Sequence, residues 1–306
     1  MKIGVVGAGA MGGFFGGHLQ RAGHQVTLVD TWQHHIDTIN TWGLTIRKDD
    51  GEMVVRVAAC QPQDLGGELD LILLMVKSFH TQAALHDIRH AITAGTVIMT
   101  LQNGIGHVDK IAAFAPPNRI IQGITTYPAD LEGPGQVSST GQGMIKMMTV
   151  DGQYSPILEE VCQAFCNGGL DCQIEPEVTV AIWEKLAFNA AMNGLCAILN
   201  IKVGGLGDST MGRELAKTIV AEVVEVALKK QIPVQHERIL ATMDMAFAEH
   251  REHQPSMLKD ILSGKPPEVE AIHGAPVQEG RRLGLALPVC ETVYRLIRII
   301  EDQDGR

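Results

Sequence analysis

The spacing of apolar and polar residues changes character once along the chain, near residue 175. Before that point, short β-branched and aliphatic runs alternate with stretches of helical periodicity. After it, the apolar residues recur only at helical spacing. This pattern predicts an α/β domain over residues 1–174, followed by an all-helical domain over residues 175–306.

The first segments predict a strand, a helix and a second strand. They are "KIGVVG", the small-residue stretch "AMGGFFGGHLQRAG", and "HQVTLVD", which ends at Asp30. A turn signal at Asp49, Asp50 and Gly51 then separates "LTIR" from "MVVRVAA", which predicts a hairpin. The unbroken apolar run "LDLILLMVK" is typical of a parallel strand buried on both faces.

Strands and helices continue to alternate up to the change in pattern. Further strands are predicted at "GTVIMTLQNG", "RIIQGITTY", "GMIKMMTVDG" and "LDCQIE", with helices over residues 81–92, 107–114 and 156–167. This alternation predicts a doubly wound sheet. In the second half, helices are predicted over residues 183–193, 214–230, 236–250, 256–264, 268–284 and 288–302.

Length and composition agree with two folded domains. The chain has 306 residues, of which 45% are hydrophobic and 20% charged, as in soluble globular proteins. No apolar run approaches the roughly 18 residues needed to cross a bilayer. The N-terminus, "MKIGVVGAGAMGG", lacks the three regions of a signal peptide, so a cytoplasmic protein is predicted.

Charge, cysteines and histidines exclude several classes of partner. The net charge of −10 and the lack of a basic cluster argue against nucleic acid and favour small molecules. The six cysteines contain no CxxC pair, so neither a disulfide framework nor a zinc site is predicted. The 12 histidines lack companion ligands at metal-binding spacing, so we expect no metal site.

Gly7, Gly9 and Gly12 form the pattern GxGxxG between the first predicted strand and the first predicted helix. In that context Gly7 permits a tight turn, Gly9 lets the backbone approach a pyrophosphate, and Gly12 lets helix and strand pack closely. Ala10 and Met11, which lie between Gly9 and Gly12, are candidate cofactor contacts as well. The motif predicts dinucleotide binding at the N-terminus of the helix.

Asp30 ends the second predicted strand, where a carboxylate accepts hydrogen bonds from the adenine ribose hydroxyls. A 2′-phosphate at that place would meet like charge, and no arginine follows directly. The sequence therefore favours NAD(H) over NADP(H). NADP(H) stays open, because Arg47 is able to fold back across the site.

Polar residues follow two more predicted strands: Lys77 after "LILLMV", and Gln102 and Asn103 after "VIMTL". Ligands of open α/β sheets bind outside the carboxyl ends of the strands, so these side chains are expected at the rim of the cofactor site. Asn103 would hold the carboxamide or ribose of the nicotinamide. Each would serve equally as a turn residue that satisfies loop backbone.

Residues 183–193, "WEKLAFNAAMN", predict a largely buried helix that carries Lys185, Asn189 and Asn193 at intervals of four. Steps of four place these side chains within one stripe, so they are able to share one ligand. The alternative is that Lys185 extends to water and the two asparagines satisfy nearby backbone groups.

Several stretches together carry a resemblance to one enzyme family. They are "GAGAMGG", "MVKSFHT", "LQNGIG", "WEKLAFNAAMN" and "PSMLKDILSGKPPEVEAIHG". In this order and spacing, over nearly the whole chain, they are similar to the ketopantoate reductase (2-dehydropantoate 2-reductase) family. The resemblance implies an N-terminal Rossmann domain, an all-helical C-terminal domain and an active site between them.

The resemblance implies that Lys185 is the catalytic acid, which protonates the substrate carbonyl oxygen as hydride arrives from the reduced nicotinamide. A free lysine has a pKa of about 10.4, and partial burial lowers it toward roughly 7 to 8, which suits a proton donor. The ammonium would also stabilise the alkoxide that develops at the carbonyl oxygen.

The resemblance also implies roles for other polar residues. Asn103 would contact both cofactor and substrate, and Asn189 and Asn193 would hold the substrate. Lys77 would line the cleft. The substrate carboxylate and hydroxyl region would be bound by Ser256 and Glu268 respectively.

Two departures from the family pattern leave the substrate and cofactor open. Asp30 replaces the basic or neutral residue of NADPH-dependent members, and Val203 stands where some members carry a substrate-binding asparagine. The first hypothesis is reduction of 2-dehydropantoate to D-pantoate in pantothenate biosynthesis. The second is an NAD-dependent D-2-hydroxyacid dehydrogenase for branched or aromatic 2-oxo acids, to whose sequences "LVDTWQHHIDTIN" is similar.

Two other readings are less favoured. A β-hydroxyacid dehydrogenase would show a Gly-Gly substrate turn, which "GITTYPADLEGPGQ" does not match. A dinucleotide-sensing regulator would need a docking surface that the acidic charge balance does not offer. The apolar content of the helical half is compatible with a homodimer, and equally with core packing.

Overall fold

The computed structural model describes residues 1–303, and its contacts divide the chain into two compact units. The first unit comprises Met1–Gln102 and His107–Val178. The second comprises the loop Asn103–Gly106 together with the chain from Thr179 onward. The sequence predicts one break near residue 175, whereas the contacts also group this short loop with the helical unit.

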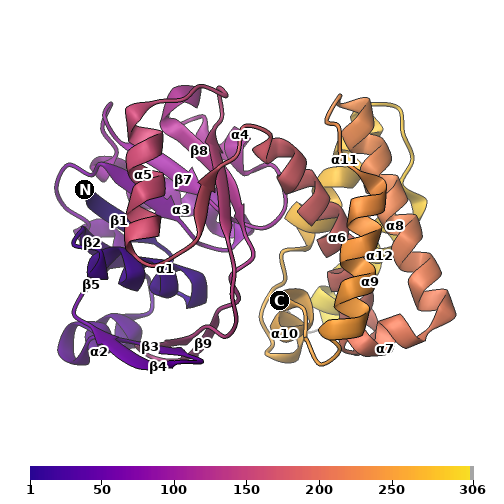
Figure 1. The fold of residues 1–306 in the computed structure, drawn as a ribbon, viewed down its shortest axis with the longest axis horizontal. Coiled ribbons are helices and arrows are strands. Elements are labelled where there is room, and N and C mark those ends of the chain that lie inside the picture. Colours follow the sequence, from indigo (N-terminus) through magenta and orange to yellow (C-terminus); the bar gives the residue numbers. More distant parts are fainter. Residues whose placement is uncertain (304–306) are drawn as a thin grey trace. The chain divides into compact units, whose positions relative to one another are not determined.

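The first unit is built on one large sheet (Figure 1). Its strands are β1 (Lys2–Val6), β2 (Gln25–Val29), β5 (Ala58–Cys60), β6 (Leu71–Leu74), β7 (Val97–Thr100), β8 (Ile120–Thr125), β11 (Ile145–Thr149) and β12 (Cys172–Ile174). They lie in the order β12-β11-β8-β7-β6-β1-β2-β5, and all neighbours are parallel except β8 and β11. From β5 to β8 this is the strand order of the Rossmann fold, so the predicted α/β fold class is confirmed.

Helices cover both faces of this sheet. Successive strand residues point to opposite faces: Val5 lies against Gly16 of α1 (Ala10–Arg21), and Val6 joins a buried cluster with Leu85 of α3 (Thr81–Asp87). The helix α5 (Pro156–Asn167) packs beside α1, with the rings of Phe15 and Phe165 5.7 Å apart. Each fully buried side chain of this size contributes about 1.5–3 kcal/mol to stability.

A second, smaller sheet joins segments that are distant in sequence. The predicted hairpin is confirmed, because β3 (Leu44–Lys48) and β4 (Gly51–Val55) pair antiparallel. Two strands that were not predicted, β9 (Asp130–Gly133) and β10 (Gln136–Ser138), complete the order β4-β3-β10-β9. These strands are short, and only their pairing identifies them: β10 pairs with β3, and β9 pairs with β10.

Several helical segments of the first unit differ from the predicted ones. The helix predicted over residues 81–92 is α3 followed by a separate 3₁₀ turn, Arg89–Ala91. The one predicted over residues 107–114 is the shorter α4 (His107–Ile111). The helix α2 (Gln33–Trp42) was not predicted. Further 3₁₀ turns are Pro62–Asp64, Ser78–His80 and Pro117–Arg119.

The described part of the second unit is helical. It contains α6 (Val178–Leu199), α7 (Val203–Asp208), α8 (Thr210–Lys229), α9 (His236–Glu249), α10 (Ser256–Leu262), the π-helix η5 (Glu270–Gly274), α11 (Ala275–Arg282) and α12 (Pro288–Gln303). Buried residues of α6, α8, α9 and α12 share one core. The helix predicted over residues 268–284 is divided, because its first part has π-helical hydrogen bonding.

Candidate active site

The glycine-rich turn joins the carboxyl end of β1 to the start of α1. The N–H groups of Gly7 and Ala8 both donate to the carbonyl of Val29, at 2.9 and 3.1 Å, which ties the turn to the end of β2. Gly7 has a φ of +93°, and a Cβ added there would lie 2.7 Å from the backbone nitrogen of Val76. Only glycine fits this position without strain.

The other two motif glycines have opposite surroundings. A Cβ on Gly12 would lie 1.9 Å from the carbonyl oxygen of Gly7, so the close approach of helix and turn requires glycine. A Cβ on Gly9 would meet nothing within 4 Å. Gly9 is also the N-cap of α1 and offers no side-chain acceptor. The first-turn N–H groups, near Ala10 and Met11, thus begin a helix beside open space, an arrangement that suits a phosphate.

Asp30 directly follows β2, at the same edge of the sheet as the glycine-rich turn. Its N–H donates to the carbonyl of Cys60 at 3.2 Å, and its carboxylate accepts the N–H of Trp32 at 3.0 Å. A carboxylate has several acceptor positions, so this bond leaves capacity for ribose hydroxyls. Arg47, which was considered for a 2′-phosphate, forms an exposed ion pair of 2.6 Å with Glu52.

The residues after β6 and β7 are held differently from each other. Lys77 is partly exposed and precedes the 3₁₀ turn Ser78–His80. The amide of Gln102 donates to the carbonyl of Val76 at 2.6 Å and to the hydroxyl of Thr81 at 2.9 Å, which links the two strand ends. Gln102 therefore has the structural role of a turn residue.

Asn103 begins the loop that the contacts place in the helical unit. The N–H of Ile105 donates to the carbonyl of Ala271 at 3.2 Å. Gly104 has a φ of +90°, and a Cβ there would lie 2.4 Å from the same carbonyl oxygen. The loop thus contacts the π-helix η5, and Asn103 belongs to the helical unit.

The polar stripe predicted over residues 183–193 lies on α6. Asn193 is buried, at 4% exposure, while Lys185 and Asn189 are partly exposed. Burial lowers the pKa of Lys185 to about 8, and the negative charge of Glu268 acts in the opposite direction. The fold thereby brings Lys185 and Glu268 into electrostatic contact although they are far apart in sequence.

Glu268 and Ser256 differ in their surroundings. Glu268 is 7% exposed and lies just before η5. A carboxylate buried to this extent is expected to have a charged or hydrogen-bonding partner, and Lys185 is one charge that acts on it. Ser256 is exposed and is the first residue of the short helix α10.

His273 of η5 was not singled out from the sequence. Its Nε2 donates to the carbonyl of Ala190 at 2.9 Å, between Asn189 and Asn193 on α6. A Cβ on Gly194 would lie 2.5 Å from that nitrogen, so the helix leaves room for the ring. Burial lowers the pKa of His273 to about 4, which keeps the imidazole neutral. The periodicity of the sequence gives no signal of a π-helix.

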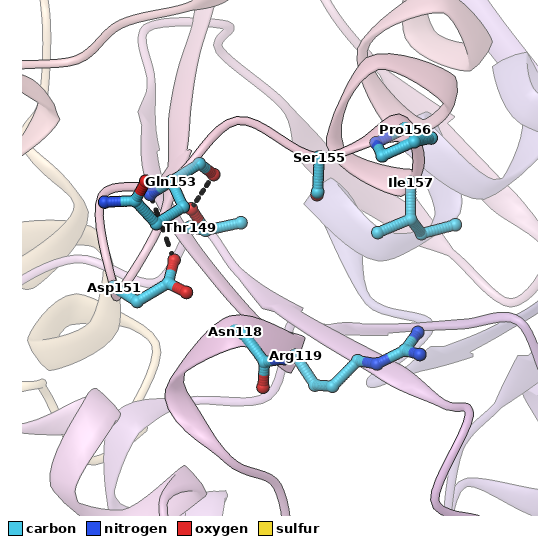
Figure 2. A pocket seen from close by; sticks show the side chains of 8 residues that line it. All are labelled: Asn118, Arg119, Thr149, Asp151, Gln153, Ser155, Pro156 and Ile157. Carbon is cyan, nitrogen blue, oxygen red and sulfur yellow. Dashed lines mark hydrogen bonds between the residues drawn. The ribbon is translucent and has the colours of Figure 1, made fainter.

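A separate hollow of about 430 Å³ lies at the start of α5 in the first unit. Figure 2 shows its lining: Asn118, Arg119, Thr149, Asp151, Gln153, Ser155, Pro156 and Ile157. The hydroxyl of Thr149 donates to the carbonyl of Gln153 at 2.6 Å, which holds one wall. None of the predicted site residues lines this hollow.

Two kinds of feature are absent from residues 1–303. In this range no group of three histidine, cysteine, aspartate or glutamate side chains is arranged to hold a metal ion. Among the described helices, none combines the length and apolar character required to cross a membrane.

Family models match most of the chain. Residues 3–152 match the model described as ketopantoate reductase PanE/ApbA, and residues 177–301 match the model of its C-terminal region. The 2-dehydropantoate 2-reductase of Streptococcus pyogenes serotype M3 is 30% identical over 302 residues, which cover 98% of each chain.

Solved structures are also similar over the full length. The ternary structure of D-mandelate dehydrogenase with NADH and anilino(oxo)acetate superposes with a TM-score of 0.96, at 31% identity and 100% coverage of both chains. The 2-dehydropantoate 2-reductase of Geobacter metallireducens has a TM-score of 0.90 at 30% identity, covering 98% of this chain and 99% of the other.

Proposed function

We propose that this chain, which belongs to the ketopantoate reductase PanE/ApbA family, reduces the keto group of a 2-oxo acid to a hydroxyl group. The single observation that carries this proposal is the pairing on the fold of Lys185, a partly exposed lysine of the apolar helix α6, with the charge of the buried Glu268, together with a Lys185 pKa of about 8. Such a group is able to donate a proton at neutral pH, which carbonyl reduction requires.

The residues of the first unit fit a nicotinamide dinucleotide. The open space at Gly9 and the uncapped start of α1 suit its pyrophosphate, and Asp30 suits the hydroxyls of its adenine ribose. When bound, the reduced nicotinamide supplies hydride to the substrate carbonyl carbon. Use of a nicotinamide cofactor is common to the family and to the similar NADH-bound structures.

Lys185 supplies the proton in the proposed reaction. Its ammonium donates to the carbonyl oxygen as negative charge develops there, and it returns to the charged form by taking a proton from solvent. The charge of Glu268 favours the protonated amine and so keeps the donor loaded near neutral pH. Burial strengthens the interaction of the ammonium with the developing alkoxide.

Four polar side chains are proposed to orient the substrate. Asn189 and Asn193 follow Lys185 along α6, so their side chains extend the same stripe. Asn103 is proposed to contact both cofactor and substrate, and Ser256 to bind the substrate carboxylate. Glu268 is proposed to bind the substrate hydroxyl region as well.

The most favoured substrate is 2-dehydropantoate, with D-pantoate as product, because the family and several similar proteins carry that activity in their names. A second candidate is a D-2-hydroxyacid dehydrogenase reaction on a branched or aromatic 2-oxo acid. It is supported by the close similarity to D-mandelate dehydrogenase. It is also supported by Val203, an apolar residue buried in the helical core at a position where some members carry asparagine.

NADH is the proposed cofactor. This proposal is supported by the negative charge of Asp30, which would repel a 2′-phosphate, and by Arg47, which forms an ion pair with Glu52. Lys77 is proposed to line the cofactor site from the end of β6. Binding of NADPH would need a positively charged side chain in place of the Asp30 carboxylate, to pair with the 2′-phosphate.

A panel of substrates and cofactors tests the proposal. The panel measures kcat/KM for 2-dehydropantoate, 2-oxoisocaproate and phenylglyoxylate, each with NADH and with NADPH. We expect the highest value with 2-dehydropantoate and NADH. A preference for one of the other acids would favour the second candidate, and no turnover of any 2-oxo acid would remove the proposed reaction.

We also propose a homodimer formed through the helical unit. Exposed apolar side chains occur on several of its helices, among them Met211 and Leu215 on α8, and Leu296 and Ile299 on α12. Light scattering on the purified protein is expected to give twice the mass of one chain. A single-chain mass at micromolar concentration would refute the dimer.

A further inference from the structure

An aromatic stack lies directly after Asp30. The indole of Trp32 and the imidazole of His35 are nearly parallel, at an angle of 8°, with ring centroids 5.4 Å apart. Trp32 is the N-cap of α2 and is 42% exposed, whereas His35 is buried at 1% exposure. The pair therefore consists of a buried ring below and an accessible indole above.

His35 is held in place by two hydrogen bonds to backbone. Its Nδ1 accepts the N–H of Gly135 at 3.0 Å, so the proton of the neutral ring lies on Nε2. The Nε2 then donates to the carbonyl of Ala8, also at 3.0 Å. Ala8 lies between Gly7 and Gly9, so the imidazole that stacks under Trp32 is hydrogen-bonded to the glycine-rich turn.

Trp32 is also joined to Asp30. Its N–H donates to the Asp30 carboxylate at 3.0 Å, which fixes the start of α2 against the end of β2. The indole is thus held from two sides, through its backbone by Asp30 and through its ring by His35. An aromatic side chain that is ordered before binding loses little entropy when a ligand stacks on it.

The position of this indole matches the place expected for the adenine base of a dinucleotide. The proposed function places the pyrophosphate at the glycine-rich turn and the adenine ribose at Asp30. The base is bonded to that ribose, so it must lie within one sugar length of Asp30. Purines stack on indole rings through their π-faces.

We propose that the Trp32 indole, supported by His35, is the stacking surface for the adenine base of the cofactor. This assignment rests on the proposed dinucleotide-dependent function. It makes Trp32 a determinant of affinity for the adenosine half, with no part in proton or hydride transfer. The purely structural alternative is that Trp32 only shields His35 from water.

The test compares Trp32→Ala and Trp32→Phe with the control Trp42→Ala, which removes a 71% exposed indole from the other end of the same helix. Isothermal titration with NADH and with ADP-ribose, which lacks only the nicotinamide base, gives the affinities. We expect Trp32→Ala to weaken both ligands about tenfold or more. Trp32→Phe should keep most of the affinity, and Trp42→Ala should match the wild type.

Quenching of tryptophan fluorescence provides a second measurement. An indole that only shields His35 from water would not be quenched by the ligand. Stacked adenine quenches indole emission, so ADP-ribose should quench the wild type and Trp42→Phe but not Trp32→Phe. Thermal unfolding of each variant checks that it is folded. Unchanged affinities in Trp32→Ala, or quenching that persists in Trp32→Phe, would overturn the assignment of Trp32.

The binding affinities distinguish a failure of the stacking surface from a failure of the proposed function. If the wild type binds NADH and ADP-ribose but Trp32→Ala binds them equally well, only the stacking surface is wrong. If the wild type binds neither ligand, the proposed function falls, and the adenine assignment falls with it.

Discussion

The main-chain N–H of Ile105 donates a hydrogen bond of 3.2 Å to the carbonyl oxygen of Ala271. Ile105 belongs to the loop after β7, and Ala271 belongs to the π-helix η5. In η5 the N–H of Ala275 bonds to the carbonyl of Glu270, five residues earlier, which shifts the regular helical pairing. The carbonyl that accepts the hydrogen bond of the loop thus belongs to a π-helix, and π-helical turns often occur at functional sites.

This contact predicts an asymmetric response to two alanine substitutions in one loop. Gly104 and Gly106 have nearly equal φ values of +90° and +89°, so Ala strains either position by about 1–2 kcal/mol. A Cβ on Gly104 would also collide with Ala271, whereas one on Gly106 meets nothing within 4 Å. In urea unfolding, Gly104→Ala should lose about 1–3 kcal/mol more than Gly106→Ala.

Activity should follow the same order. Displacement of the loop would move Asn103, so Gly104→Ala should lower kcat/KM at least tenfold while Gly106→Ala stays near the wild type. Equal losses of stability and activity in the two variants would mean that the contact with Ala271 does not position Asn103.

Lys185 is expected to be required for turnover but not for cofactor binding. Lys185→Ala removes the proton donor and should lower kcat by about 10²-fold or more. Lys185→Arg is the matched control, because it keeps the positive charge but its pKa is too high for efficient donation. Stopped-flow turnover and NADH titration measure the two effects. Full turnover in either variant would remove Lys185 from the mechanism.

The pH profile is expected to report the pair Lys185 and Glu268. Reduction needs the protonated amine, so kcat/KM should fall as the pH rises through about 8, the pKa of Lys185. Glu268 raises that pKa by its charge, so Glu268→Gln should move the falling limb to lower pH. The pH dependence of kcat/KM for both proteins checks the direction.

Glu184→Gln serves as the control for this experiment. Glu184 is the chain neighbour of Lys185, but it forms an ion pair with Arg238. Removing its charge should therefore leave the limb close to its wild-type position. A limb that moves to higher pH in Glu268→Gln would contradict the assigned sign of the interaction.

Asp30 is expected to set the choice between NADH and NADPH. Asp30→Asn removes the negative charge but keeps an oxygen that accepts the N–H of Trp32. NADH should bind more weakly and NADPH relatively better, so that the ratio of their kcat/KM values changes by about tenfold or more toward NADPH. If both cofactors lose equally, the ribose hydroxyls are held by other residues.

Local patterns were sufficient for much of the fold. The unbroken apolar run before Lys77 produced β6, which is buried on both faces. The turn at Asp49 and Asp50 produced the hairpin, because loop length and turn residues determine the pairing of adjacent strands. The glycine pattern likewise located the turn between β1 and α1, since a φ of +93° at Gly7 excludes other residues. The sequence alone therefore determined the elements whose signals lie within a few neighbouring residues.

Only the tertiary structure decided the contacts between distant segments. The sequence does not contain a local signal for the pairing of β10 with β3, for the hydrogen bond between Ile105 and Ala271, or for the effect of the Glu268 charge on Lys185. Each depends on which surfaces the packed helices and sheets leave adjacent. A lysine on an apolar helix is compatible with solvent or with a site, and the pKa near 8 arises from burial, which no local periodicity specifies.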